Sequence, residues 1–260
     1  QVVAGPGVNA IPAGGTANFT LDAGDVLQLM GQPGPFWGDP HSDLSGSLVK
    51  ADKNVQVIGV VALTSVPSPE TFGEGYADHL EETILPSEVL GQRYVVTPPS
   101  SSTGANIGHH LRFYGNFDGT TLSYPGGAPA GAPTTLDSGE VVSLTTDESF
   151  EVMGSQSFAI ASFGRGGQAH TPNAVPTVGD PAFSLAVATD QYRSRYVFLA
   201  PVDYLDSFAD IIMPADAEVL LDGAARPVEG VLALNSVTTR TRSASAAVEM
   251  ADMRAYKPSR

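Results

Sequence analysis

The sequence contains no cysteine in its 260 residues. Disulfides, zinc–thiolate sites, iron–sulfur clusters and cysteine nucleophiles are therefore excluded from this chain. The lack of disulfides does not argue against secretion, because a chain of this length can be stabilised by burial of its core alone.

Charged residues are also scarce, at 16% of the chain, where an average soluble domain has roughly 25%. The 28 acidic residues outnumber the 13 basic ones, which gives a net charge of −15. Such a charge repels phosphate backbones and anionic membrane surfaces, so we expect no nucleic-acid partner. No run of about 18 apolar residues occurs. We therefore expect no membrane insertion within this chain.

The residues that are abundant favour short strands and turns. The chain has 28 Gly and 20 Pro, and 42% of its residues are hydrophobic. Alternating or β-branched runs between turn signals predict strands. These runs are Ala17–Leu21, Val26–Met30, Val55–Leu63, Arg93–Thr97, Leu111–Phe117, Thr120–Tyr124, Glu140–Leu144, Phe158–Phe163, Arg195–Leu199 and Glu218–Leu221. A hairpin turn is expected at 116–121, and a helical turn or two only around Tyr76–Leu90, where Pro86 limits it.

Two short patterns recur along the chain. Leu21-Asp22-Ala23-Gly24-Asp25-Val26-Leu27-Gln28-Leu29 matches Leu136-Asp137-Ser138-Gly139-Glu140-Val141-Val142-Ser143-Leu144, and Arg93-Tyr94-Val95 returns as Arg195-Tyr196-Val197. The first pattern predicts strand, Asp/Gly turn and strand in both copies. We interpret the two patterns together as an internal repeat of about 100 residues, the size of a β-sandwich.

The predicted fold is therefore all-β, with tandem β-sandwich-like units. We place a first β-unit at 1–92, with a loop insertion at 31–42, and a second at 93–194. A partial third unit at 195–260 is expected to pack on the first. A single large two-sheet domain is the alternative, because each repeated motif is only a few residues long.

Two stretches of the chain carry a family resemblance. One is Asp43-Leu44-Ser45-Gly46-Ser47 followed by Ala51-Asp52-Lys53-Asn54-Val55; the other is Asp78-His79-Leu80-Glu81-Glu82-Thr83-Ile84-Leu85-Pro86, leading to Leu90-Gly91-Gln92-Arg93-Tyr94-Val95. Their order and spacing resemble the N-terminal domain of the IgG-Fc-binding protein family. The low lysine content, abundant alanine and lack of cysteine are similar to its bacterial members. The resemblance implies a secreted or cell-surface module with an adhesive or structural role, and it includes no catalytic signature.

The segment Gly38-Asp39-Pro40-His41 offers one candidate chemistry. The same four residues mark a self-cleavage site in some mucin-type domains, where a strained Asp–Pro bond breaks with help from a nearby histidine. An ordinary turn is the simpler interpretation, because the cysteine framework of those domains is missing. On this interpretation Trp37, Asp39 and His41 are candidate ligand-binding residues.

Metal ions are considered at two places. His79, Glu81 and Glu82, with His109 or His110, would have to converge to make a metal-dependent hydrolase, and no helical His-Glu-x-x-His motif is present. Asp203, Asp206 and Asp210 form an acidic cluster that is a candidate calcium site, although solvated turns are the default interpretation. No other cofactor is expected.

No residue pattern here predicts catalysis. No Ser elbow of the Gly-x-Ser-x-Gly type occurs, and Gly164-Arg165-Gly166-Gly167 lacks the Lys-Ser/Thr of a phosphate-binding loop. We expect a non-enzymatic extracellular or cell-surface module that binds a protein, a glycan or copies of itself. The alternative functions are a structural subunit of an extracellular layer or filament, with assembly through edge strands, and the metal-dependent hydrolase.

Overall fold

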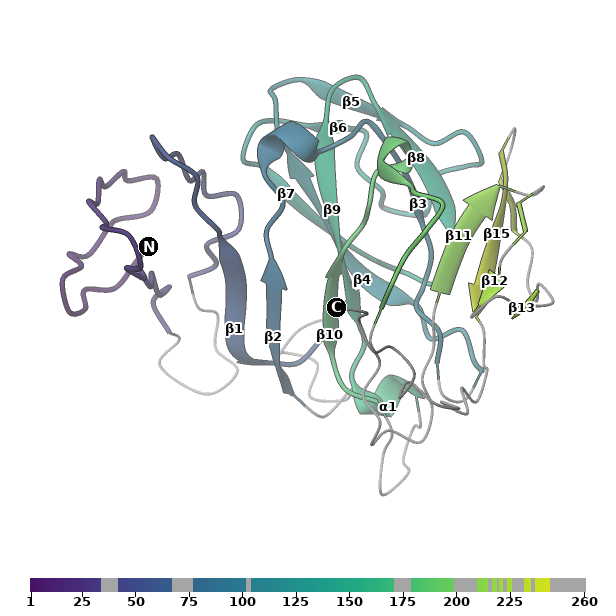
Figure 1. Ribbon diagram of the computed structural model, residues 1–260, viewed down its shortest axis with the longest axis horizontal. Helices are drawn as coiled ribbons and strands as arrows, with labels where there is room; N and C mark the ends of the chain where they lie inside the picture. Colours follow the sequence, from purple (N-terminus) through teal and green to yellow (C-terminus); the bar gives the residue numbers. More distant parts are fainter. Residues whose placement is uncertain are drawn as a thin grey trace, which may run out of the picture.

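The protein is described by a computed structural model (Figure 1). It describes residues 1–33, 42–66, 77–101, 104–170 and 179–198, and parts of the C-terminal region, namely 210–214, 217–218, 220–221, 224–225, 232–234 and 237–243. Nearly all regular elements in these residues are strands. The exceptions are the short helix α1 (Gly167–His170) and two 3₁₀ turns, Ser87–Val89 and Thr189–Gln191. The predicted all-β class is confirmed.

Two four-stranded antiparallel sheets form the centre of the molecule (Figure 1). In one, the strand order is β10-β9-β4-β7, and in the other it is β3-β8-β5-β6. The first sheet consists of β4 (His109–Gly115), β7 (Val141–Thr146), β9 (Phe158–Gly164) and β10 (Ala182–Leu185). The second consists of β3 (Arg93–Val96), β5 (Thr120–Ser123), β6 (Thr135–Leu136) and β8 (Phe150–Gly154).

The two sheets pack face to face through alternating apolar side chains. In β4, Leu111 and Phe113 are fully buried, whereas His110, Arg112 and Tyr114 point to the opposite face. Each large apolar side chain buried in this way contributes about 1.5–3 kcal/mol relative to an exposed one. The shared core comprises Tyr94, Val96, Leu111, Phe113, Leu122, Leu136, Leu144, Phe150, Val152, Phe158, Ile160 and Ala188. This arrangement is a β-sandwich.

A hairpin of β1 (Ile58–Thr64) and β2 (Asp78–Thr83) lies beside the first sheet, with β2 in contact with β10. The expectation of a helical turn or two around Tyr76–Leu90 is met only at the end of that range, where the 3₁₀ turn Ser87–Val89 follows Pro86; Asp78–Thr83 is a strand instead. The described residues from 77 onwards form β2 and then the 3₁₀ turn. Leu80 is buried between exposed neighbours, a period of two that suits a strand.

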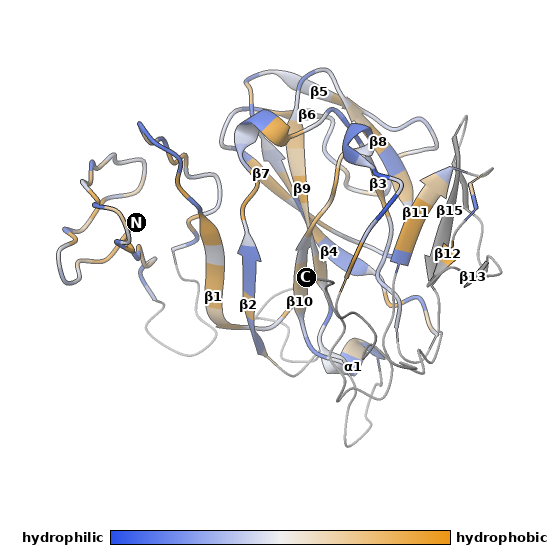
Figure 2. Ribbon diagram, in the orientation of Figure 1, coloured by the Kyte–Doolittle hydropathy of each residue, from blue (hydrophilic) through white to orange (hydrophobic). Residues whose placement is uncertain are grey.

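The free edge of the hairpin belongs to β1, which is apolar along most of its length (Figure 2). Ile58, Val60 and Leu63 are exposed. Within the described residues, β1 pairs only with β2.

The C-terminal strands lie on the opposite side of the sandwich from β1 (Figure 1). The strands β11 (Asp210–Pro214), β14 (Leu232–Leu234) and β15 (Val237–Ser243) form a three-stranded sheet, and β12 (Leu220–Leu221) pairs with β13 (Ala224–Ala225). Helices that are long and apolar enough to cross a bilayer are absent from the described part of the chain.

Four of the expected strands are missing or shortened. Residues 17–21 and 26–30 form no strand, and neither do the described residues 195–198; of the strand expected at Glu218–Leu221, only Leu220–Leu221 is present. In the segments that form no strand, the apolar side chains are largely exposed, because no neighbouring strand pairs with them. The structure around 1–33 contains only isolated bridges, such as Val2 with Ile11.

The first repeated pattern forms the same turn in both copies. The Asp25 amide donates to the Asp22 carbonyl at 3.0 Å and the Glu140 amide donates to the Asp137 carbonyl at 3.0 Å. In each turn the acidic side chain also accepts from the first Asp amide, at 2.9 Å and 2.8 Å respectively. The flanking strands form only in the second copy, so a repeat beyond the turn, and the three-unit division, stay predictions.

Candidate functional site

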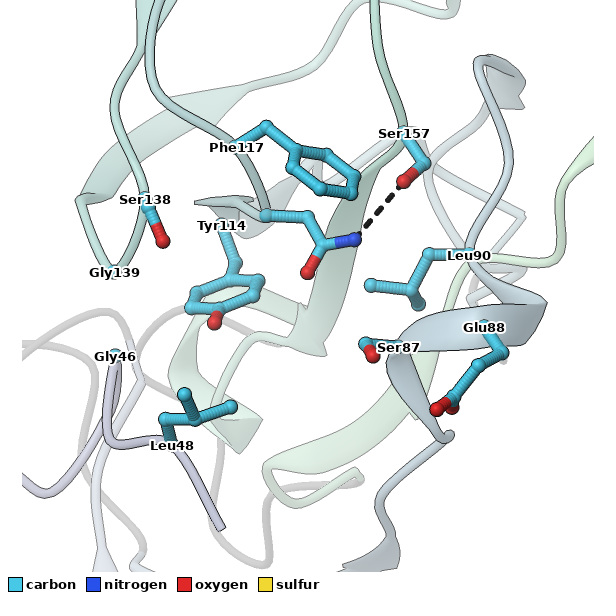
Figure 3. Close-up of a pocket in the computed structure, with 11 residues that line it drawn as sticks. Gly46, Leu48, Ser87, Glu88, Leu90, Tyr114, Phe117, Ser138, Gly139 and Ser157 are labelled. Carbon is cyan, nitrogen blue, oxygen red and sulfur yellow. Dashed lines mark hydrogen bonds between the residues drawn. The ribbon is translucent and has the colours of Figure 1, made fainter. Parts of the chain in front are cut away.

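A groove of about 570 Å³ lies on the sandwich surface and is the candidate functional site (Figure 3). Five segments converge on it, and one of them is the turn between β8 and β9, which contributes Ser157. The other four are residues 42–48, which we call the strap, the 3₁₀ turn Ser87–Val89 with Leu90, the end of β4 with the connection after it, and the turn between β6 and β7. The lining residues are Gly46, Leu48, Ser87, Glu88, Leu90, Tyr114, Asn116, Phe117, Ser138, Gly139 and Ser157.

The strap is held on the outer face of the first sheet by Arg112 of β4. The guanidinium Nη1 donates to Asp43 Oδ2 at 2.6 Å and to Ser45 Oγ at 3.0 Å. Asp43 also accepts the Ser45 amide at 2.8 Å, which closes a local turn. Although burial opposes it, the hydrogen bonds from Ser45 and the charge of Arg112 lower the pKa of Asp43.

Gly46 brings the strap against the β6–β7 turn. Its φ of 84° is in the left-handed region, which favours glycine. A Cβ at this position would lie 2.3 Å from the Gly139 carbonyl oxygen, so only glycine allows the approach. This side of the groove is therefore formed by backbone from two segments in direct contact.

The β6–β7 turn is fixed by the neighbouring loop after β4. Asp137 Oδ1 accepts the Gly119 amide at 2.8 Å, and Asp118 Oδ1 accepts the Ser138 amide at 3.0 Å. This reciprocal pair fixes the position of Ser138, whose side chain lines the groove.

Two aromatic residues lie between the ends of the groove. Tyr114 projects from β4 on the outer face of the sheet, and Phe117 follows in the loop, with 49% of its surface exposed. Figure 3 shows both rings between Ser138 on one side and Glu88 on the other. An exposed phenylalanine at the edge of a groove offers an apolar face to a ligand.

Hydrogen-bonding groups of the groove are mostly uncharged. Asn116 Nδ2 donates to Ser157 Oγ at 3.0 Å, which orients the amide and leaves its Oδ1 as an acceptor. Within the described part of the chain, the hydroxyls of Ser87, Ser138 and Tyr114 have no protein partner. Glu88 is the only acidic or basic residue in the lining. The arrangement can bind a ligand by hydrogen bonds and apolar contact.

A second hollow of about 660 Å³ lies beside α1. Several of its polar groups are used by the protein itself. Arg165 Nη1 donates to the Ile107 carbonyl at 2.7 Å, and His170 Nδ1 lies 3.2 Å from Ser101 Oγ. We therefore take the first groove as the candidate site.

The ligand-binding and calcium residues predicted from sequence fall mainly outside the described residues. Trp37, Asp39 and His41 lie there, with the whole 38–41 segment, and so do Asp203 and Asp206. Asp210 is described, and its carboxylate accepts the amide and hydroxyl of Ser100 at 2.9 Å and 2.5 Å. Both sites stay predictions.

The histidines considered for a metal-dependent hydrolase are in three different environments. His79 is exposed beside Glu81, at 3.5 Å. His109 is buried with Nδ1 3.1 Å from Ser162 Oγ, while His110 faces the other way, with Nδ1 2.9 Å from Thr145 Oγ1. In the described ranges no group of three or more His, Asp or Glu side chains is placed to hold a metal ion.

The groove itself was missed by the sequence analysis. The loop at 116–121 was predicted only as a hairpin turn, and no binding role was given to Tyr114 or Phe117. The one local signal is a phenylalanine between Asn116 and Asp118 in an exposed turn, and it does not by itself indicate a site, because single hydrophobic residues are common on protein surfaces.

Comparison with known proteins gives one match. The family model described as IgGFc binding protein matches residues 1–257, which is nearly the whole chain. No curated protein and no solved structure matches the chain.

Proposed function

Because the chain belongs to the IgGFc binding protein family, which is a binding-type family, we propose that it is a secreted or cell-surface module that binds a partner in the groove without catalysing a reaction. An extracellular location suits a family described by binding to the Fc part of an antibody. The charge of −15 opposes binding to nucleic acid or anionic lipid.

The composition of the groove lining is the observation that carries this proposal. Binding sites combine apolar surface with a few fixed polar groups, as Leu48, Leu90 and the two aromatic rings do here with the serines and Asn116. A catalytic site would need an acid, a base or a nucleophile activated by a neighbour. Glu88 is the only carboxylate in the lining, and no histidine accompanies it.

The proposed partner is an extracellular protein, bound directly or through its glycans. The test is biolayer interferometry of the folded chain against an immobilised IgG Fc fragment and a panel of other extracellular proteins. We expect a partner whose affinity falls at least tenfold on Phe117→Ala, because truncation of a central aromatic residue removes most of a local contact. The control is Phe198→Ala, another exposed phenylalanine that is not in the groove.

Two results would overturn the proposal. One is a partner whose binding is unchanged in Phe117→Ala while Phe198→Ala weakens it. The other is a covalent change in the partner, detected by mass spectrometry after incubation with the chain, which would indicate an enzyme.

A second candidate function, a subunit of an extracellular layer or filament, is supported by the edge of β1. Exposed apolar edge strands pair with other strands, and charged residues usually prevent this. No charged residue occurs from Asn54 to Val66, so two copies could meet here without direct charge repulsion despite their net charge. Sedimentation velocity tests this function. Assembly that grows with concentration and is abolished by Val60→Lys supports it, and a monomer at all concentrations excludes it.

A further inference from the structure

We infer that the groove selects an uncharged carbohydrate chain. This inference rests on the proposed function, because it names the ligand class of the same groove. It is carried by three features of the lining: the kind of free hydrogen-bonding groups, the exposed aromatic surface, and the charge.

The free polar groups match the hydroxyls of a sugar. Ser87, Ser138 and Tyr114 each offer a hydroxyl that can donate or accept, and Asn116 Oδ1 adds an acceptor. A sugar hydroxyl also donates one hydrogen bond and accepts others, so each of these groups can be satisfied by the same ligand. A ligand without such groups would bury the four polar groups unpaired, which costs free energy at each.

The aromatic rings match the apolar faces of a sugar ring. A pyranose ring carries C–H groups on its faces, and the negative face of an aromatic ring attracts their positive edges. Phe117 is half exposed, and Tyr114 lies in the same groove with its ring half-buried. The apolar side chains of Leu48 and Leu90 extend this surface. The groove therefore offers apolar and hydroxyl contacts to one ligand.

Charge excludes acidic sugars and phosphates. No Lys, Arg or His lines the groove, and Glu88 would repel a carboxylate or sulfate. Arg112 of β4, which holds the strap, is already paired with Asp43 at 2.6 Å.

The shape argues for a short chain of sugars over an extended peptide. A volume of about 570 Å³ lies within the range of about 300–1,000 Å³ that small-ligand sites occupy. A peptide that binds by strand addition needs an open sheet edge. In the described lining, Tyr114 belongs to the inner strand β4, and the other residues lie in turns, a loop and the strap. The apolar edge strand β1 and the edge strands β3, β6 and β7 of the sandwich contribute no residue to the lining.

The experiment is a glycan array of neutral and acidic oligosaccharides probed with the folded chain, followed by calorimetric titration of the best neutral binder. We expect retention of neutral oligosaccharides only. Phe117→Ala should lose at least tenfold in affinity and Phe117→Tyr, which keeps the ring, less than threefold. Ser138→Ala should lose about three- to tenfold, whereas the control Ser184→Ala, an exposed serine on β10, should be unchanged. Circular dichroism confirms that each variant is folded.

The outcomes separate this inference from the proposed function. If the chain binds an extracellular protein equally well before and after enzymatic removal of its glycans, and no free neutral oligosaccharide binds, the proposed function stands and the glycan inference is wrong. Retention of acidic oligosaccharides alone, or neutral binding that Phe117→Ala leaves intact, also overturns the inference. If neither protein nor glycan binds, both proposals fail.

Discussion

Arg112 Nη1 lies 2.6 Å from Asp43 Oδ2, and this ion pair joins the strap to the central strand β4 across 69 residues of sequence. Both side chains are partly exposed. A pair of this kind contributes less than about 1 kcal/mol to global stability. Although this contribution is small, the ion pair matters for the shape of the groove, because the strap that it holds forms one side of the groove.

Replacing Arg112 with alanine should loosen the strap without unfolding the sandwich. The strap turn is closed by the Ser47 amide, which donates to the Leu44 carbonyl at 3.1 Å. We expect amide hydrogen exchange at Ser47 to accelerate up to about fivefold, which corresponds to a local loss of about 1 kcal/mol. The control is Arg193→Ala, since Arg193 donates only to nearby carbonyl groups. Exchange that is equal in both variants would contradict the role of the ion pair.

Gly46→Ala should close or distort the groove, whereas Gly24→Ala should not. Both glycines have positive φ, at 84° and 94°, so alanine brings a similar backbone strain of about 1–2 kcal/mol in each. Only at Gly46 does the new Cβ collide, 2.3 Å from the Gly139 oxygen, while nothing lies within 4 Å at Gly24. Ligand affinity should therefore fall at least tenfold in Gly46→Ala alone. Titration of both variants checks this, and equal affinities would show that the contact does not shape the site.

Tyr94→Phe should destabilise the sandwich by about 1–3 kcal/mol. The Tyr94 hydroxyl accepts the buried Gly91 amide at 3.0 Å and donates to the Phe158 carbonyl at 2.6 Å, so its removal leaves both without a partner. Tyr196 occupies the same place in the second Arg-Tyr-Val tripeptide but is 67% exposed, against 1% for Tyr94. Tyr196→Phe should change stability by less than about 0.5 kcal/mol. Urea denaturation measures both, and similar losses would refute the difference in environment.

Arg93→Met should cost about 3 kcal/mol, because it leaves a buried carboxylate alone. Glu151 is 1% exposed and accepts from Arg93 Nε at 2.5 Å, and its second oxygen, Oε2, has no hydrogen-bond partner in the described structure. We place the loss at the lower end of the usual range because Arg93 is about one-third exposed. The double variant Arg93→Met with Glu151→Leu should recover most of the stability. A double variant that is less stable than the single one would show that the pair contributes more than charge compensation.

Acidification from pH 7 to pH 5 should weaken the fold through His109. Burial lowers the pKa of His109 from 6.5 to about 4, against a smaller opposite effect of the Glu148 carbonyl. His109 is therefore protonated below about pH 6.5 in the unfolded chain but only below about pH 4 in the folded chain. Between these two pH values, the free energy of unfolding decreases as the pH is lowered. At pH 5 the loss is about 2 kcal/mol. His109→Gln should show a correspondingly smaller change between the two pH values in urea denaturation, and an unchanged slope would assign the effect to other groups.

The part of the fold that could be predicted is the part in which local pattern and tertiary environment agree. In β4 the alternation of Leu111 and Phe113 with polar neighbours predicts a strand with one buried face, and the structure has it. The turn at Asp137–Glu140 follows equally from an Asp and a Gly, whose backbone dihedrals suit it.

Other elements depend on tertiary neighbours that cannot be identified from the local sequence. The acidic segment from Asp78 to Thr83 forms a strand because β1 pairs with it, a tertiary effect that overrides its local preference. The tripeptides at Arg93 and Arg195 are identical, yet only the first finds a partner strand, β8. The groove escaped prediction for the same reason: Leu48, Glu88, Phe117 and Ser138 belong to four separate segments, and no motif links them.

The ion pair between Arg112 and Asp43, which tethers the strap to β4, should make ligand binding depend on salt concentration. The groove would bind an uncharged ligand, whose own interactions do not respond to ionic strength. Added salt screens the exposed tether, however, and so releases one side of the groove. The affinity for a neutral ligand would then decrease at high salt concentration, although the ligand does not contact the Arg112–Asp43 ion pair.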